Sequence, residues 1–467
     1  MKPAHKQLWP VLLLVGLTAC SGGGTSATPE TVAAAEITAV WTVGEMRPLY
    51  SSDTTCYYRS QYRGWKSEDD SYGYNLVTRV DYDTLEETPV CRVPGCTHDS
   101  SECLAYLNLL SQYQIIAAGD GSLLLYHLGW DSSSEQNMME AYEAVLNDPA
   151  RLEVEYPGER GRQYLQECID QLQEPSYVDR ISADGLSRER LVTLPEGVNP
   201  SLVCWDGEAL YGMVMDGNLD VNTVEYVIRI GLDSQVDTFE IPDPGYTTMM
   251  GGWNGKLVLR HFRSPVDMNT MFLYGNYSGF YALEREATYD CWLYDSATGE
   301  TEKIRMPDDK VRILSIVGDE LVYSRSVDQQ DELCVYDLLA GESRTLCALE
   351  GSVATAAPIN NPSGAERFVY SYKNQMAAIM ELSTGYAYTL EELQQMAGEI
   401  PSGYYVSSVL CETGDDRLLL ELYASGSRYP IYTTIPSPVT PEEEVADVQT
   451  SLQSVQEYVE QAEEAAS

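Results

Sequence analysis

A short polar turn followed by an apolar strand recurs along most of the chain, and this repetition constrains the fold more than any other feature. In each copy, Gly, Asp or Asn residues precede a run of aliphatic and aromatic residues, which is the pattern of antiparallel hairpins. Seven copies begin at Ser51, Gly119, Trp205, Trp253, Val317, Ser363 and Thr413. The repetition therefore predicts an all-β fold made of similar units.

A second hairpin follows the first one in the repeat. Its clearest copies place Tyr294-Asp295 and Tyr336-Asp337 at the end of a strand, and each continues through a Gly-Glu turn into another strand. Two hairpins make a four-stranded blade, and such blades stack radially because none can bury both of its faces alone. We therefore predict a β-propeller over residues 37–438, with about seven four-stranded blades and with six or eight blades as the alternatives. A β-sandwich would not explain why the two hairpins keep the same phase.

The strand at residues 37–43 is expected to complete the last blade, which would close the ring and remove its open edges. The turn-and-strand pattern resembles the TolB-like and WD40-like propellers found in bacterial lipoproteins of unknown function. The resemblance covers about residues 37–438 and implies a fold but no catalytic residue. The Gly-His and Trp-Asp signature of true WD40 repeats does not recur in this sequence, which disfavours that assignment.

The N-terminus carries the features of an export signal. Two lysines precede Leu8–Ala19, a mostly apolar run that is too short to span a bilayer. The run ends at Cys20 in a Leu-Thr-Ala-Cys sequence that resembles the bacterial lipobox, which implies removal of residues 1–19 and diacylation of the Cys20 thiol. Residues 20–36 then form a flexible tether, and we expect an extracytoplasmic protein that is lipid-anchored at the bacterial cell surface. A chance cysteine after an ordinary secretory signal is the alternative.

The chain is strongly acidic, with 29 Lys and Arg residues against 72 Asp and Glu residues and a formal net charge of −43 at pH 7. Its basic residues form no stripe that could follow a phosphate backbone, so nucleic acid is not expected as a partner. The same charge repels anionic membrane surfaces, which leaves the lipid on Cys20 as the expected membrane contact.

Two internal segments interrupt the repeat. Residues 132–173 contain two helix-like stretches on either side of Pro157-Gly158, and they are expected to cap one face of the ring. Residues 264–288 form a loop rich in aromatic rings, which stack on sugars or peptides when they are exposed. Packing of these rings on their own blade is the alternative. The candidate ligand-binding residues in this loop are Phe272, Tyr274, Tyr277, Phe280 and Tyr281.

Residues 439–467 are predicted to form an acidic C-terminal helix. Thr440-Pro441-Glu442 has the cap and first-turn residues of a helix start. Apolar residues then recur three and four positions apart from Val445 to Ala462, as in a coiled-coil seam. A helix docked on its own propeller and a helix that associates with a second copy or a partner are the two interpretations.

One cluster of residues is suited to metal chemistry. Cys91, Cys96, His98 and Cys103 lie within thirteen residues and are turned by Pro94-Gly95. Three thiols and an imidazole are the ligand set and number that tetrahedral zinc prefers. A disulfide between two of the cysteines, which export would favour, and three free thiols are the alternatives. A metal here would be structural, because four protein ligands leave no open coordination position.

The sequence contains no motif that fixes a reaction. It has no Gly-x-Ser-x-Gly elbow and no phosphate-binding loop, and in so acidic a chain the closeness of two carboxylates is uninformative. His127 and His261 are interpreted as solvent-exposed residues at strand ends, and cysteines such as Cys204 and Cys411 as small core hydrophobes. We therefore predict a tethered propeller that binds a protein or a glycan at the cell envelope. The alternatives are a glycan-processing enzyme with acidic residues in its central channel and an assembly component that acts through the C-terminal helix.

Overall fold

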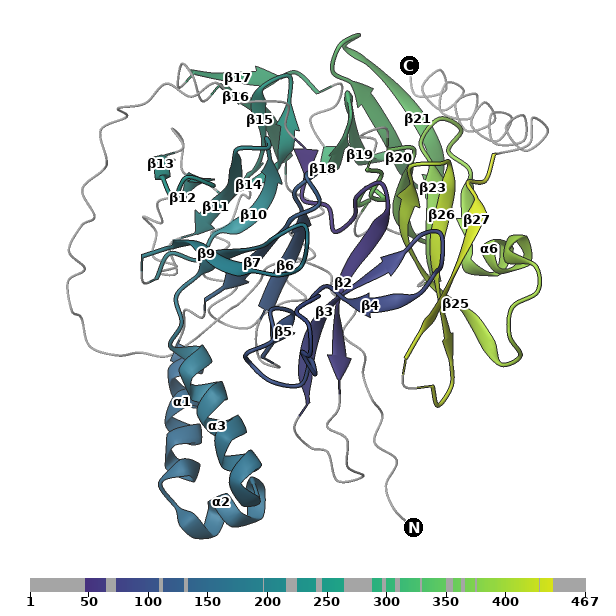
Figure 1. Cartoon of the computed structure of the whole chain (residues 1–467). Helices are drawn as coiled ribbons and strands as arrows, with labels where there is room; N and C mark the ends of the chain where they lie inside the picture. Colours follow the sequence, from purple (N-terminus) through teal and green to yellow (C-terminus); the bar gives the residue numbers. More distant parts are fainter. Residues whose placement is uncertain are drawn as a thin grey trace, which may run out of the picture.

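The computed structural model describes residues 47–63, 73–108, 112–129, 133–195, 197–215, 225–240, 246–263, 288–295, 300–306, 311–327, 330–349, 356–362, 366–373, 376–427 and 429–439. These residues form seven antiparallel sheets, which are the seven blades of a β-propeller (Figure 1). The predicted fold class is therefore confirmed. None of the helices in these ranges is both long and apolar enough to cross a bilayer.

The blades follow one another in chain order. Blade 1 contains β2 (Cys56–Arg63), β3 (Tyr74–Asp81), β4 (Glu87–Pro89) and β5 (Tyr106–Leu107); blade 2 contains β6 (Gln112–Ala117), β7 (Leu123–Leu128), β8 (Tyr177–Ile181) and β9 (Arg188–Thr193); and blade 3 contains β10 (Ser201–Trp205), β11 (Ala209–Met215), β12 (Glu225–Gly231) and β13 (Val236–Glu240). The sheet of blade 3 is extended by β1 (Arg47–Pro48), which pairs with β10.

Blades 4 and 5 have the same organisation, whereas the described residues of blades 6 and 7 form sheets of three strands each. Blade 4 contains β14 (Tyr246–Trp253), β15 (Lys256–Arg263), β16 (Thr288–Asp295) and β17 (Glu300–Ile304); blade 5 contains β18 (Val311–Val317), β19 (Glu320–Val327), β20 (Gln330–Asp337) and β21 (Glu342–Leu349); blade 6 contains β22 (Phe368–Lys373), β23 (Met376–Glu381) and β24 (Ala387–Thr389); and blade 7 contains β25 (Tyr404–Thr413), β26 (Arg417–Ala424) and β27 (Ile431–Pro436). A bridge between Pro358 and Val369 adds a short inner segment to blade 6.

The core of the ring lies between the blades. In the described part of the chain, seven apolar clusters each join two neighbouring blades, and the seventh joins the last blade to the first through Val80, Cys411 and Leu419. The alternating apolar residues of each strand therefore face the two adjoining blades, as the radial stacking requires. The predicted closing strand at residues 37–43 lies outside the described residues.

The predicted turns are held by aspartate side chains. Asp206 Oδ1 accepts hydrogen bonds from the backbone N–H groups of Glu208 and Ala209 at 2.9 and 2.8 Å, and the Tyr211 hydroxyl donates to Asp206 Oδ2 at 2.8 Å. Asp53 in blade 1 makes the same three kinds of bond, including one from the Tyr58 hydroxyl at 2.6 Å. An Asp followed five residues later by a Tyr thus fixes both the turn and the strand that leaves it.

The segment before blade 1 crosses the centre of the ring. β1 pairs with β10, at the inner edge of blade 3. The backbone N–H of Ala117 in blade 2 donates to the Tyr50 carbonyl at 2.8 Å, and the Asn360 side chain beside blade 6 donates to the Ser52 hydroxyl at 2.5 Å. These partners belong to blades on different sides of the ring, so the segment spans its axis. No local sequence pattern indicates this path, because its partners lie far away along the chain.

The helical insertion differs in two ways from the expectation. It contains three helices, α1 (Ser133–Leu146), α2 (Pro149–Glu155) and α3 (Gly158–Leu172), instead of two. The additional helix α2 begins after Asp148, whose side chain accepts bonds from two backbone N–H groups of its first turn. The three helices, which we call the arm, project from blade 2 rather than capping a face of the ring (Figure 1).

A further helix, α6 (Leu390–Ala397), was not predicted, although its start can be read from the sequence. Thr389 and Glu392 form a capping box, in which each side chain bonds to the backbone N–H of the other residue. Leu393 of this helix is fully buried in the cluster between blades 6 and 7. The predicted C-terminal helix falls in residues 440–467, which lie outside the described residues.

Candidate metal centre

The cysteine and histidine cluster lies in the loop that joins β4 to β5 in blade 1. Cys91 and Cys103, near the two ends of this loop, are buried, whereas Cys96 and His98 are partly exposed. The two buried cysteines belong to the apolar cluster between blades 1 and 2, where they pack with Leu125 of β7 and its neighbours. The two ends of the cluster are therefore built into the contact between two blades, whereas most of the loop between them is exposed.

The loop folds back so that its four side chains converge. The ligand atoms of Cys91, Cys96, His98 and Cys103 all lie within 4.8 Å of one another, and His98 Nδ1 is 3.4 Å from Cys103 Sγ. Gly95 and His98 have positive φ angles of 81° and 59°, which reverse the chain between the cysteines. A tetrahedral zinc ion holds its sulfur ligands about 3.8 Å apart, given Zn–S bonds of about 2.3 Å. The cluster can thus hold a metal ion with small side-chain movements.

The two buried thiols have opposite electrostatic environments. Burial acts to raise the pKa of Cys91, but hydrogen bonds from the backbone N–H groups of Val93 and Leu104 outweigh it and lower that pKa. For Cys103, burial is the main effect and raises the pKa to about 12. A cation at the cluster would supply the charge that the Cys103 thiolate needs, because a metal ion takes the place of the thiol protons.

The sequence analysis left open a disulfide in place of a metal. All ten cysteines in the described part of the chain have free thiols. A disulfide needs only two cysteines with a suitable separation, whereas the structure brings a third thiol and an imidazole to the same point. The arrangement of all four residues is therefore the feature that a metal ion explains and a single disulfide does not.

The loop contacts blade 2 through its backbone. The N–H of Arg92 donates to the Gly185 carbonyl in the β8–β9 turn at 2.9 Å. Gly185 has a φ of 68°, and a Cβ atom at this position would lie 2.4 Å from the Val90 carbonyl oxygen. Beyond the loop, Arg188 of β9 donates to the carbonyls of Leu104 and Tyr106 at 3.2 and 3.0 Å. The cluster and blade 2 thus approach each other at a distance that only glycine permits.

Residues in and just after β5, which follows this loop, contact the arm. The Tyr106 hydroxyl donates to Glu167 Oε2 of α3 at 3.3 Å, and the Asn108 side chain donates to the Glu167 carbonyl at 3.1 Å. Glu167 also forms an ion pair with Arg160 at 2.9 Å. Sequence reasoning missed these residues, because nothing in their local pattern indicates that segments sixty residues apart will meet.

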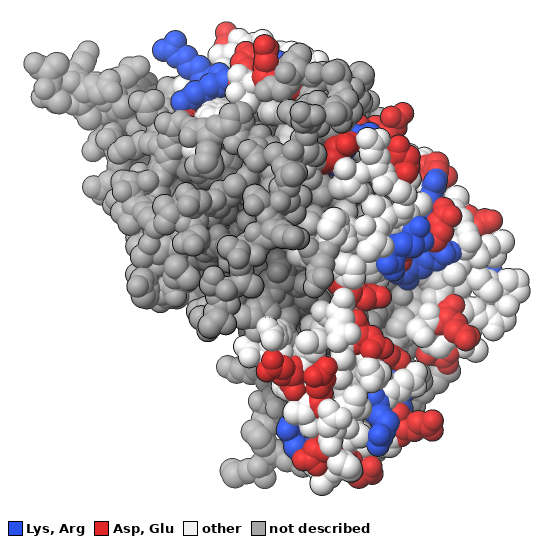
Figure 2. Space-filling model, turned by 90° about the vertical axis from the view of Figure 1, so that its left-hand side faces the viewer, with Lys and Arg blue, Asp and Glu red and all other residues white. Residues whose placement is uncertain are grey.

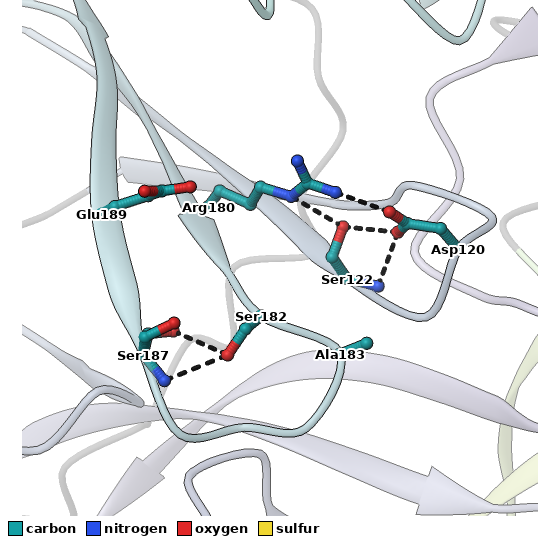
Figure 3. Close-up of a pocket in the computed structure, with 7 residues that line it drawn as sticks. All are labelled: Asp120, Ser122, Arg180, Ser182, Ala183, Ser187 and Glu189. Carbon is teal, nitrogen blue, oxygen red and sulfur yellow. Dashed lines mark hydrogen bonds and ion pairs between the residues drawn. The ribbon is translucent and has the colours of Figure 1, made fainter.

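A pocket of about 210 Å³ lies at the β8–β9 turn, between this turn and the turn that precedes β7 (Figure 3). The Arg180 guanidinium in this pocket donates to Asp120 Oδ2 at 2.5 Å and to the Ser122 hydroxyl at 3.1 Å. The pocket is small and open compared with small-molecule sites, which usually enclose about 300 to 1,000 Å³. The residues that line it are Asp120, Ser122, Arg180, Ser182, Ala183, Ser187 and Glu189.

The remaining sequence predictions have different outcomes. Cys20 and the five aromatic residues of the 264–288 loop lie outside the described residues, so both stay predictions. Cys204 and Cys411 are fully buried in the core, as expected. The expectation of exposed histidines is wrong. His261 is buried and bonded to the Thr247 hydroxyl at 2.9 Å, and His127 is fully buried between two tyrosine rings.

The fold and the site define a seven-bladed β-propeller with a Cys3His cluster between its first two blades and a helical arm on the second. Charged side chains of both signs are interspersed on the described part of the face that carries the arm (Figure 2). No protein-family model matches the sequence. No curated protein matches it either.

Solved propeller structures are similar to the chain at low sequence identity. The β-propeller domain of the Trilobed protease from Pyrococcus furiosus has a TM-score of 0.44 and 9% identity, with 84% of this chain and 92% of that chain covered. An acylaminoacyl peptidase has a TM-score of 0.45 and 10% identity over 84% of this chain. The chain spans about half of that peptidase, 51% of its length. TolB from Acinetobacter baumannii has a TM-score of 0.33 and 12% identity, with coverages of 81% and 80%. The assignment as a propeller rests on the sheets themselves.

Proposed function

We propose that the chain is a lipid-anchored, extracytoplasmic propeller that binds a protein partner through its arm. The observation that carries this proposal is that the arm is a folded element that contributes no strand to blade 2. β7 and β8 continue in register on either side of it, with His127 opposite Tyr177. The N–H of Gly129 donates to the Ser176 hydroxyl at 2.9 Å, so the two ends of the insertion meet.

The arm has an apolar core of its own. Val145, Leu152, Leu165 and Ile169 are buried against one another, and Met139, Tyr142 and Tyr156 pack around them. The outward surface of the arm is polar, with exceptions such as Val154, whose side chain is 81% exposed. Folded elements carried on a rigid scaffold are where binding residues are usually found, and projecting helices offer a large surface to another protein.

A zinc ion at Cys91, Cys96, His98 and Cys103 is part of the same proposal. The four side chains supply three thiolates and one imidazole, which is a complete tetrahedral set for zinc. Such an ion has no open position for a substrate, so its role is structural. It would stabilise the irregular loop between β4 and β5 and hold blade 1 against blade 2.

A lipid on Cys20 would hold this binding module at the envelope. The proposal is supported by the apolar run and the lipobox-like sequence before Cys20, together with the Gly- and Ser-rich sequence that follows. A glycan is the second candidate ligand. It is favoured by the five aromatic residues of the 264–288 loop, because such rings stack on sugars when they are exposed.

Site-specific photo-crosslinking in the cells that make the protein tests the role of the arm. A photoreactive residue at Val154 is compared with one at Leu339 in the β20–β21 turn of blade 5. The two side chains are 81% and 70% exposed, so they are equally accessible to a passing protein. A discrete crosslinked product from position 154 and none from position 339 is expected. The same products from both positions, or no product from position 154, would contradict the proposal.

A further inference from the structure

We propose that the metal ion at the Cys3His cluster determines whether the arm is held in a fixed position on blade 2. This inference rests on the proposed function, because it describes the regulation of the surface that would meet the partner. It depends on three sets of contacts that connect the cluster to the arm through a single short segment, Cys103–Asn108.

The first contacts lie at the cluster end of this segment. Cys103 is one of the four residues that would hold the ion, and two residues separate it from β5, whose Leu107 pairs with Asn75 of β3. The backbone N–H of Tyr106 donates to the Cys103 carbonyl at 3.0 Å. The backbone of Cys103 is therefore bonded directly to the backbone of Tyr106, so a displacement of Cys103 would be transmitted to Tyr106.

The second contacts lie at the arm end. The Tyr106 hydroxyl and the Asn108 side chain both bond to Glu167, one through the carboxylate at 3.3 Å and the other through the backbone carbonyl at 3.1 Å. Glu167 is in the second half of α3, and its carboxylate also pairs with Arg160, which lies on the same face of the helix two turns earlier. The segment thus bonds to both the side chain and the backbone of Glu167 in α3.

A third set of contacts joins the segment to the base of the arm. Arg188 of β9 donates to the Leu104 and Tyr106 carbonyls and pairs with Asp179 of β8 at 2.8 Å. Arg190 also bonds to Asp179 and lies over the Tyr177 ring, 3.3 Å from its centroid. Tyr177 is the first residue of β8 after the arm. A displacement of the segment would therefore change contacts both at α3, on the side of the arm, and at the start of β8, at its base.

The loop before this segment makes few backbone hydrogen bonds. Its residues from Arg92 to Cys103 are all described and contain no helix or strand. Their N–H groups donate to three backbone carbonyls, those of Gly185, Val93 and Ser100, and the Val93 N–H also donates to the Cys91 sulfur. Zinc would add four strong bonds. The balance is one Zn²⁺ bound and three thiol protons released, which leaves three thiolates and a neutral imidazole on the ion. The ion therefore decides how firmly the segment is positioned.

Hydrogen exchange followed by mass spectrometry on the complete mature chain tests the inference. Exchange is measured on the zinc-loaded protein and after zinc is removed with a chelator under reducing conditions. Peptides from α3 report on the arm, and peptides from α6, which packs between blades 6 and 7, report on the rest of the ring. Removal of zinc is expected to speed exchange in α3 by roughly tenfold while α6 is unchanged.

A double variant separates loss of the contact from loss of the fold. Tyr106→Phe with Asn108→Ala removes both bonds to Glu167, keeps all four ligands and is expected to bind one zinc per chain. Its α3 exchange should already be fast in the zinc-loaded state and should not respond to zinc removal. The matched control is Arg151→Gln, which breaks an exposed ion pair with Glu155 elsewhere on the arm and should exchange like the unchanged protein.

The outcomes distinguish the inference from the function on which it rests. If zinc binds and α3 exchanges at the same rate with and without it, the coupling is wrong and the binding function stands. If removal of zinc also speeds exchange in α6, the metal stabilises the whole ring and the comparison with and without zinc does not isolate the arm. The zinc-loaded double variant then tests the coupling, and slow α3 exchange in that variant would overturn it. A chain that binds no zinc overturns the metal centre and the coupling together, whereas the crosslinks from position 154 test the binding function independently.

Discussion

Arg59 of blade 1 and Glu421 of blade 7 form an ion pair with Nη1 and Oε2 2.8 Å apart. Arg59 also donates to the Tyr432 hydroxyl at 2.9 Å, and that hydroxyl donates to Glu87 at 2.8 Å. The pair therefore joins the first and last blades of the ring, beside the apolar contact of Val80 with blade 7.

Replacement of Arg59 is expected to weaken the closure of the ring. Arg59→Met keeps the apolar stem but leaves Glu421, whose side chain is 12% exposed, without its cation. Loss of one partner of a largely buried pair should lower the free energy of unfolding by about 2 kcal/mol. Urea unfolding measures the change. Arg151→Met removes a pair whose side chains are 50% and 43% exposed and should cost less than about 0.5 kcal/mol; equal costs would argue against the closure role.

The metal centre predicts one zinc per chain in protein purified under reducing conditions. Cys103→Ser should reduce the bound zinc to a small fraction, as measured by elemental analysis, whereas Cys347→Ser in blade 5 should leave it unchanged. Zinc affinity should fall as the pH falls, by on the order of 100-fold or more between pH 8 and pH 6, because ligation displaces thiol protons. Zinc contents that are the same in both variants would disprove the assignment of the ligands.

His127 should make stability depend on pH. Burial, followed by the charge of Arg190, lowers its pKa from 6.5 to about 4, and in the described structure neither ring nitrogen has a hydrogen-bond partner. Because the unfolded chain takes up this proton at a higher pH, stability is complete above about pH 6.5 and is lost as the pH falls towards 4, by about 3 kcal/mol in total. The free energy of unfolding in urea should therefore fall more steeply with decreasing pH for the unchanged protein than for His127→Phe between pH 6.5 and 4. Above pH 7.5, the difference in free energy of unfolding between the two proteins should be constant.

Gly185 and Gly197 form a matched pair for testing the contact between the metal loop and blade 2. Their φ angles are 68° and 78°, but a Cβ would lie 2.4 Å from the Val90 oxygen at Gly185, whereas nothing lies within 4 Å at Gly197. Gly197→Ala should cost about 1 kcal/mol for its backbone conformation. Gly185→Ala should lower the free energy of unfolding by about 2 kcal/mol more than Gly197→Ala, because of the contact with the Val90 oxygen, and it should also reduce zinc affinity. Equal losses of stability in the two variants would mean that the loop can move away from blade 2 at little cost.

The anchor predicts that Cys20 carries the lipid. In cells fed a clickable palmitate analogue, the unchanged protein should be labelled and should sediment with membranes. Cys20→Ala should abolish the label and release the protein from the membrane fraction, whereas Cys347→Ser should change neither. Membrane association that persists in Cys20→Ala would point to a different attachment.

The sequence predicts the parts of this fold that depend on local chemistry. The turns at Asp53 and Asp206 have the same structure because each carboxylate bonds to backbone N–H groups two and three residues away, and Gly, Asp or Asn recurs at the corresponding turns of the other blades. The four members of the metal centre were also predictable, because they lie within thirteen residues. The contact of Tyr106 with Glu167 was not, because it joins segments that only the completed ring brings together. The burial of His127 was missed for a related reason, since its cover comes from Tyr113 and Tyr177 on neighbouring strands.

The segment from Arg47 to Ser52 has a mechanical consequence. In the anchored protein that we propose, a pull on the tether enters the ring at its centre instead of at its rim. The load is shared by the ladder between β1 and β10 and by the bonds of Tyr50 to Ala117 and of Ser52 to Asn360, which belong to three different sectors of the ring. These bonds are strained together, so a force from the membrane would have to shear several of them before it could peel any single blade from its neighbours.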